Sequence, residues 1–131
     1  MRTRFLVLAL AIFCGGAWAA DWTLIRDDKE PGEKTYVDKS TLVRTGSLAR
    51  MWTLTNYQRP KGVAGRKHLS EKALVEYDCK TREFRKIEFG WYSRHDGGGE
   101  LVYKDPDPGT MLPVIPNSSE EAAWRIACKQ K

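Results

Sequence analysis

Apolar and polar residues alternate along most of this chain, and a period of two is typical of β-strands rather than helices. Successive side chains of a strand point to opposite faces, so the alternation marks strands with one face turned toward a core. Glycine, proline and charged residues interrupt the alternation and divide it into strands joined by turns. The strands predicted in this way cover residues 21–26, 35–38, 40–44, 48–57, 68–79, 81–94 and 100–104.

Two of these segments predict more than a strand. Residues 48–57 have apolar or β-forming side chains on both faces, which indicates a central strand of the sheet. In residues 81–94, unbroken alternation places one set of side chains on a single face: Arg85, Ile87, Phe89 and Trp91. Phe84 and Tyr92 then lie on the other face.

Loop-forming residues separate the strands. Residues 58–67 hold one proline and two glycines among four basic side chains, which predicts an exposed loop. Residues 96–99 are Asp-Gly-Gly-Gly, a hairpin signal, because glycine adopts the positive φ that tight turns require. Residues 105–117 contain four prolines, which exclude regular structure there without implying disorder.

A helix is predicted after residue 117. Ser118 is suited to cap its first turn, and Glu121 stands where a capping box places its glutamate. Trp124 and Cys128 are four residues apart and share one face, so the helix packs inward. The predicted fold class is α+β, a meandering antiparallel sheet of about six strands with one C-terminal helix.

The first 19 residues have the features of a secretory signal peptide. Two arginines precede an unbroken apolar run over residues 5–13, and small residues follow at Ala17 and Ala19. The run is far shorter than the roughly 20 apolar residues of a membrane-spanning helix. We therefore expect cleavage after Ala19, a single domain over residues 20–131, and no transmembrane segment.

Cys14 raises the alternative of a bacterial lipoprotein, in which a lipid is attached to a cysteine that follows the apolar run. That processing requires a small residue just before the cysteine, and this position holds Phe13. A lipid anchor at Cys14 is therefore not expected. We place the exported protein in the periplasm, or secreted at the cell surface.

The charge balance is mildly basic. Removing the leader's two arginines from 22 basic side chains leaves 20 against 17 acidic ones, a net charge of +3. Such a balance permits attraction to anionic surfaces, but it lacks the dense basic stripe of a nucleic-acid-binding protein. Nucleic acid is therefore excluded as a partner.

Cys79 and Cys128 are the cysteines that remain after cleavage, and an even pair in an exported domain predicts one disulfide. The bond would close a loop of about 50 residues and stabilise the domain by roughly 4 kcal/mol in the chain-entropy model. The alternatives are two free thiols or two metal ligands. The sequence has neither a CxxC motif nor paired histidines, so zinc is poorly supported.

No catalytic constellation is evident, and we expect no enzyme activity, cofactor or metal. His68 and His95 are the histidines of the chain, and both adjoin predicted loops, which favours solvated turn positions. Asp105 and Asp107 flank a proline and could suggest calcium. Without a ligand series at loop spacing they are better explained as turn-forming acids.

Basic side chains supply the candidate binding patch, which would attract anionic glycans, lipopolysaccharide or acidic proteins. Its members come from the predicted loop at 58–67 and from the predicted strand at 81–94: Arg59, Lys61, Arg66, Lys67, Arg85 and Lys86. The alternative is a solvated surface that aids solubility. Most aromatic side chains should belong to the core, with one or two exposed as contact anchors that the sequence does not single out.

The mature chain resembles the surface-adhesin protein E family of Gram-negative bacteria. The run Glu76-Tyr77-Asp78-Cys79 is the firmest element of the likeness. The other matching positions are Trp22, Tyr36-Val37-Asp38, Arg44, the run at 52–57, Ser70, Tyr92-Ser93, Pro116, Ser118 and Cys128. The resemblance implies an antiparallel sheet with a C-terminal helix, often dimeric, with a disulfide between the matching cysteines. It also implies a non-enzymatic adhesin that binds host extracellular-matrix and serum proteins.

We therefore expect an exported, non-catalytic binding domain whose partner is a protein or an anionic component of the envelope or extracellular matrix. One alternative is a periplasmic inhibitor or accessory protein of the cell envelope, acting through residues 59–67 or 96–99. A small enzyme with His68 or His95 in a polar cleft is a second alternative.

Overall fold

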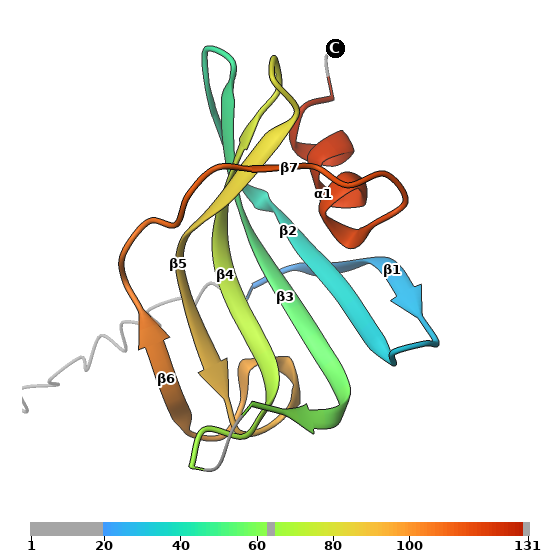
Figure 1. Ribbon diagram of the computed structural model, residues 1–131, viewed down its shortest axis with the longest axis vertical. Helices are drawn as coiled ribbons and strands as arrows, with labels where there is room; N and C mark the ends of the chain where they lie inside the picture. The colour runs from blue at the N-terminus through green and yellow to red at the C-terminus, as the bar shows by residue number, and fades with distance from the viewer. Residues whose placement is uncertain (1–19, 63–64, 130–131) are drawn as a thin grey trace, which may run out of the picture.

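The computed structural model describes residues 20–62 and 65–129. Within them, six strands follow one another and pair antiparallel in chain order (Figure 1). They are β1 (Trp22–Asp28), β2 (Glu33–Thr45), β3 (Leu48–Lys61), β4 (His68–Asp78), β5 (Glu83–Tyr92) and β6 (Leu101–Asp105). A short strand β7 (Leu112–Pro113) pairs with β5, and helix α1 (Ser119–Ala127) ends the fold. The predicted fold class is confirmed; the expected cleavage after Ala19 and the lipid question at Cys14 lie outside the described residues.

The strands differ from the prediction at several places. The prediction of no regular structure in residues 105–117 is wrong, because Leu112–Pro113 form β7 and pair with Phe84 and Glu83 of β5. The predicted strands at 35–38 and 40–44 are one strand, β2, whose pairing with β3 is interrupted between Asp38 and Val43. The Asp38 carboxylate accepts from the Ser40 backbone N–H at 3.0 Å at that interruption. The predicted loop at 58–67 also begins late, because β3 continues to Lys61.

Helix α1 packs on one face of the sheet, which we call the helix side (Figure 1). Alternate residues of β2, β3 and β4 meet the helix there, as the period of two predicted for these strands. The buried cluster comprises Val37, Ala49, Met51, Ala73, Val75, Tyr77, Ala123 and Ala127. The helix covers only part of that face, and in Figure 1 the start of β4, the end of β5 and β6 extend beyond it.

A β-bulge at Ile87 changes the register of β5. Leu74 pairs with Glu88 while the next residue of β4, Val75, pairs with Lys86, so Ile87 is the extra residue. The predicted unbroken alternation is therefore wrong. Phe84 and Lys86 lie on the helix side with Phe89 and Trp91, and Arg85 points to the opposite face.

Residues 96–99 do not form a free hairpin tip. The turn at His95–Gly97 folds back onto the ends of β3 and β4. Asn56 and Asp96 exchange two hydrogen bonds of 2.7 and 2.8 Å, and the Gly97 N–H donates to the Ser70 hydroxyl at 3.0 Å. These contacts fix the turn against the sheet.

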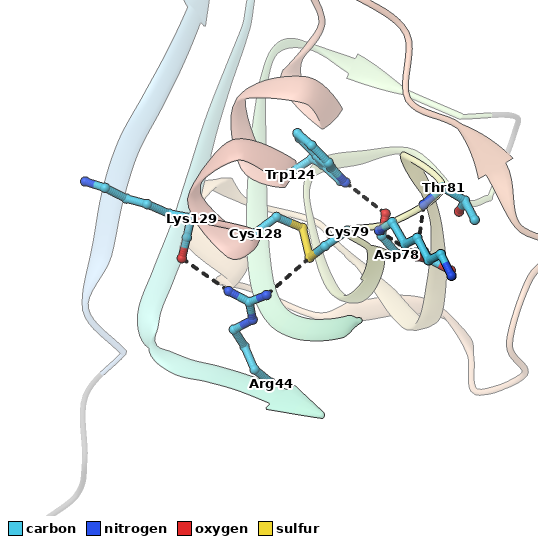
Figure 2. The surroundings of a disulfide bond; sticks show 8 residues. Arg44, Asp78, Cys79, Thr81, Trp124, Cys128 and Lys129 are labelled. Carbon is cyan, nitrogen blue, oxygen red and sulfur yellow. Dashed lines mark hydrogen bonds between the residues drawn. A yellow bond between two sulfur atoms is a disulfide. The ribbon is translucent and has the colours of Figure 1, made fainter. Parts of the chain in front are cut away.

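The disulfide joins the end of the sheet to the end of α1 (Figure 2). Cys79 follows β4, Cys128 follows the helix, and their Cα atoms are 5.4 Å apart. The Trp124 indole N–H donates to the Asp78 carbonyl at 3.1 Å beside it. Arg44 reaches across from β2 and donates to the Lys129 carbonyl at 3.2 Å.

The helix begins as predicted. The Ser118 hydroxyl accepts from the Glu121 N–H at 3.1 Å. The Glu121 carboxylate returns to the Asn117 N–H, at 3.4 Å, rather than to that of Ser118. In the described part of the chain, no helix has the length and apolar character needed to cross a membrane.

Candidate binding surface

The six basic residues of the predicted patch do not share one surface. Lys61 and Lys86 lie on the helix side, where they pair with glutamates of the sheet. Arg66 approaches the same side, and Arg85 lies on the opposite face with Glu76. Arg59 and Lys67 are exposed and lie close to Lys61 and Arg66 in the sequence. The structure therefore brings together Lys61, Arg66 and Lys86 and separates Arg85 from them.

Each of these three cations lies over an aromatic ring. The Lys61 ammonium is 5.1 Å from the ring centroid of Tyr57. The Arg66 guanidinium is 4.9 Å from that of Tyr103, and the Lys86 ammonium is 4.9 Å from that of Phe89. A cation over an aromatic face gains about 0.5–1 kcal/mol at an exposed site. We call this set, together with Trp91, the basic–aromatic strip.

Strand pairing produces the strip. One row of residues crosses the sheet on the helix side, each directly opposite the next: Thr35, Thr55, Glu71, Trp91 and Tyr103. Neighbouring strands are about 4.8 Å apart, so such a row is a continuous line of contacts. Trp91 and Tyr103 touch, with ring centroids 4.8 Å apart. The rings of the strip are thus held on regular strands, whereas Arg66 belongs to the connection between β3 and β4.

Trp91 is fixed in place by two polar side chains. Its indole N–H donates to the Glu71 carboxylate at 2.9 Å. The His68 ring stacks on it with a centroid distance of 4.3 Å and an interplanar angle of 8°. His68 is only 4% exposed, so the prediction of a solvated turn histidine is wrong at this position. Its ring is enclosed by aromatic neighbours at the start of β4.

The strip's charges are only partly neutralised. Lys61 pairs with Glu33 at 2.7 Å, and Lys86 pairs with Glu71 at 2.5 Å. Burial raises the pKa of Tyr57 between these pairs, and the nearby carboxylates of Glu71 and Glu33 add to the shift. Within residues 20–62 and 65–129, no carboxylate lies within 4 Å of the charged groups of Arg59, Arg66 or Lys67. Arg66 is the strip's free positive charge, and the exposed Arg59 and Lys67 carry two more close to Lys61 and Arg66 in the sequence.

A wider cleft of about 500 Å³ lies between the turn after β1, the end of β3 and the His95–Gly97 turn. Its carboxylates are already engaged: Asp27 with Lys29 at 2.8 Å, and Asp96 with Asn56 at 2.7 Å. His95 is exposed and contacts the Tyr57 carbonyl at 2.7 Å through Nε2. We assign no ligand to this cleft.

The acids at 105 and 107 form a turn. The Asp105 carboxylate accepts from the Asp107 N–H at 3.0 Å, which is the role expected of an aspartate beside a proline. Among the residues that the structure describes, no group of three or more histidine, cysteine or acidic side chains is placed to hold a metal ion.

Sequence reasoning missed the aromatic half of the strip. Tyr103 and Tyr57 lie in different strands and meet the basic residues only after the sheet has formed. Simple alternation in β6 would place Tyr103 on one face with Leu101. The pairing with β5 instead shifts register between Trp91 and Tyr92, so Tyr103 lies opposite Trp91 and Leu101 lies opposite Tyr92.

A comparison with protein-family models matches residues 22–129 to the model described as surface-adhesin protein E. The chain belongs to the surface-adhesin protein E family. This family assignment covers nearly the whole described fold, including both cysteines of the disulfide.

Solved structures of Haemophilus influenzae protein E have the same fold. The selenomethionine form is 17% identical, with a TM-score of 0.59 over 80% of this chain and 84% of that one. Crystal form II is 15% identical, with a TM-score of 0.57 over 72% of this chain and 79% of that one. Protein E from a non-typeable strain is 17% identical, with a TM-score of 0.57 over 80% of this chain and 74% of that one. No curated relative matches this chain.

Proposed function

We propose that this protein is an exported, non-catalytic adhesin that binds extracellular proteins of a host through the basic–aromatic strip. Membership of the surface-adhesin protein E family supports an adhesin. The observation that carries the choice of surface is the set of three cations, each over an aromatic ring, on the helix side of the sheet and reaching the first turn of α1.

The composition of the strip suits a protein interface. Tyrosine, tryptophan and arginine are the residues most enriched where proteins recognise one another. Rings held in a sheet lose little conformational entropy on binding, because their side chains are already ordered by stacking. The free charges of Arg59, Arg66 and Lys67 would attract acidic segments or sulfated chains of the partner. The anionic partner expected from the sequence therefore becomes part of this proposal.

Removing the free charges should weaken binding without unfolding the domain. We expect Arg59→Ser/Arg66→Ser/Lys67→Ser to bind a solubilised extracellular-matrix preparation and heparin about tenfold more weakly at low salt, because exposed charges set electrostatic attraction. The difference should shrink at 1 M salt, where the Debye length is about 3 Å. Surface plasmon resonance on the disulfide-bonded mature protein measures the affinity at low salt and at 1 M salt.

The matched control is Lys39→Ser/Lys80→Ser/Lys129→Ser, which removes the same charge from exposed positions outside the strip. Equal losses in the two triple variants would show that net charge, not the strip, attracts the partner. The same protein samples test the inhibitor alternative by their effect on lysozyme activity. The contacts that fix Asp96 and Gly97 against the sheet argue against a protruding loop there, so residues 59–67 are the segment through which that alternative would act.

Export is proposed together with this function. We expect the mature protein to begin at Ala20, to carry no lipid, and to be recovered from the periplasm or the cell surface. Intact-mass spectrometry of the fractionated protein checks all three points. A mass that includes residues 1–19, or a diacylglyceryl group on Cys14, contradicts the proposal. The homodimer implied by the family resemblance stays a prediction that light scattering measures.

A further inference from the structure

A narrow groove separates the first turn of α1 from the sheet on the helix side. Its volume is about 120 Å³. Three threonines, Thr35, Thr53 and Thr55, form its floor, and carboxylates from β2, β4 and α1 line it: Glu33, Glu71 and Glu120. The groove lies next to the basic–aromatic strip, because Tyr57 and Lys86 line both.

One hydroxyl on a largely buried residue opens onto the groove and has no protein partner among the described residues. Thr35 is 6% exposed, and its side chain makes no hydrogen bond to any residue that the structure describes. Thr53 differs, because its hydroxyl donates to the Ala73 carbonyl at 3.3 Å. No fully buried side-chain nitrogen or oxygen of the described residues lacks a hydrogen-bond partner, so the Thr35 hydroxyl is reached by solvent through the groove that it lines. The Thr35 hydroxyl is therefore available to a group that enters the groove.

The groove also has one carboxylate in excess of its cations. Lys61 neutralises Glu33, and Lys86 neutralises Glu71. Among the described residues, no cation lies within 4 Å of the Glu120 carboxylate, whose one side-chain contact is the Ser119 hydroxyl at 3.3 Å. Arg26 is the next cation, and its guanidinium is held by Asp28 at 2.7 Å.

We propose that this groove binds the ammonium or guanidinium end of a lysine or arginine side chain. The chain already uses ammonium groups to satisfy the other two glutamates of the groove, and Glu120 and Thr35 offer the same oxygen chemistry to a third cation. Clefts that enclose whole small molecules measure about 300–1,000 Å³. A groove of about 120 Å³ instead accommodates the end of a single side chain.

This inference deepens the proposed function and rests on it for the identity of the partner. A partner that fits both surfaces presents one basic side chain beside an acidic or sulfated segment. The chemistry of the groove is independent of that partner and can be measured with a short peptide.

Titration of the mature, disulfide-bonded protein with acetyl-Gly-Lys-Gly-amide, followed by NMR, tests the groove. We expect the amide resonances of Thr35, Thr55 and Glu120 to shift, with the arginine peptide acting similarly and acetyl-Gly-Gln-Gly-amide at least fivefold weaker. Glu120→Gln should weaken lysine-peptide binding at least fivefold. Glu88→Gln, a matched change on the opposite face, should leave it unchanged.

Equal binding of the glutamine peptide, or full binding by Glu120→Gln, would overturn the proposal. So would a titration in which methyl glucoside shifts these resonances and the lysine peptide does not. The melting temperature of Glu120→Gln confirms that the variant is folded. If the groove binds lysine but the strip variant retains full matrix binding, the proposed function fails and the groove stands.

Discussion

Loss of the Cys79–Cys128 disulfide is expected to lower the free energy of unfolding by about 2–5 kcal/mol, the usual range for a small secreted domain. The cysteines are 49 residues apart, and a loop of that size corresponds to roughly 4 kcal/mol in the chain-entropy model. The bond closes the segment that includes β5, β6, β7 and α1. Reduction therefore frees the second half of the chain in the unfolded state.

Helix α1 depends on this bond more than the strands do. It has nine residues, and isolated helices shorter than about 12 residues are marginal in water. Its remaining attachments include two small buried side chains, Ala123 and Ala127, the Trp124 hydrogen bond to Asp78, and an exposed ion pair of Glu121 with Arg82 at 2.9 Å. We expect α1 to loosen first, which would expose Ala49 and Tyr77 beneath it.

Urea unfolding with and without reductant measures the loss, and Cys79→Ser/Cys128→Ser is the matched variant. The variant should resemble the reduced wild type and should itself be insensitive to reductant. Native-state hydrogen exchange should show faster exchange in α1 than in β3 and β4 after reduction. An unchanged urea midpoint in reductant would rule out a stabilising disulfide.

Local pattern was enough to predict the strands and the helix cap. Alternation identified β3 and β4 because each packs one face on the helix, and the Ser118 cap follows from a local motif. Alternation failed in β5, because the bulge at Ile87 leaves strand propensity intact while it exchanges the two faces. The prediction for His68 failed because its enclosing rings, Tyr57 and Trp91, come from other strands.

The candidate surface was only half predictable, because its contacts also depend on strand pairing rather than on local sequence. Arg85 and Lys86 are adjacent basic residues in the sequence, yet a strand sends neighbours to opposite faces. Their carboxylate partners, Glu76 and Glu71, lie earlier in the chain and become partners through the pairing of β4 with β5. Sequence thus reports the charges, and the register decides which are neutralised.

Glu76 is the centre of an ion-pair network on the face opposite α1. Arg50 on β3 and Arg85 on β5 stand directly across from it. Arg50 Nε donates to it at 2.8 Å, and Arg85 donates through Nε at 3.0 Å. Glu76 is 3% exposed, whereas the arginine side chains are 50% and 33% exposed. The carboxylate is buried beneath guanidiniums that still reach water.

These contacts set the sign of the pH dependence. Burial raises the pKa of Glu76, but the hydrogen bonds from Arg50 and Arg85 outweigh burial, so its pKa lies below the usual value. A carboxyl whose pKa is lower in the folded state contributes stability above its unfolded pKa. The contribution is lost as pH falls from the usual glutamate range through the folded value.

Replacing Arg50 and Arg85 together should lower the free energy of unfolding more than replacing Glu76. In Arg50→Met/Arg85→Met the Glu76 charge is left buried without a partner, which we expect to cost about 3 kcal/mol at pH 7. In Glu76→Gln the guanidiniums can turn to water, and we expect a loss of about 1 kcal/mol. Urea unfolding at pH 7 measures both, with Arg59→Met/Arg94→Met as the control for replacing exposed arginines.

Through Glu76, acidification should raise the stability of Arg50→Met/Arg85→Met and lower the stability of the wild type. Without its arginines, only burial acts on Glu76, so its pKa should rise above the usual range. Protonation relieves the buried charge, and the double variant should gain stability relative to the wild type between pH 7 and pH 5. A larger loss for Glu76→Gln than for the arginine pair, or a pH dependence identical to the wild type, would mean that the arginines do not hold Glu76 ionised. The network would then be a surface contact of little energetic weight, and the Glu76-Tyr77-Asp78-Cys79 run would owe its structural role to Tyr77 and the disulfide.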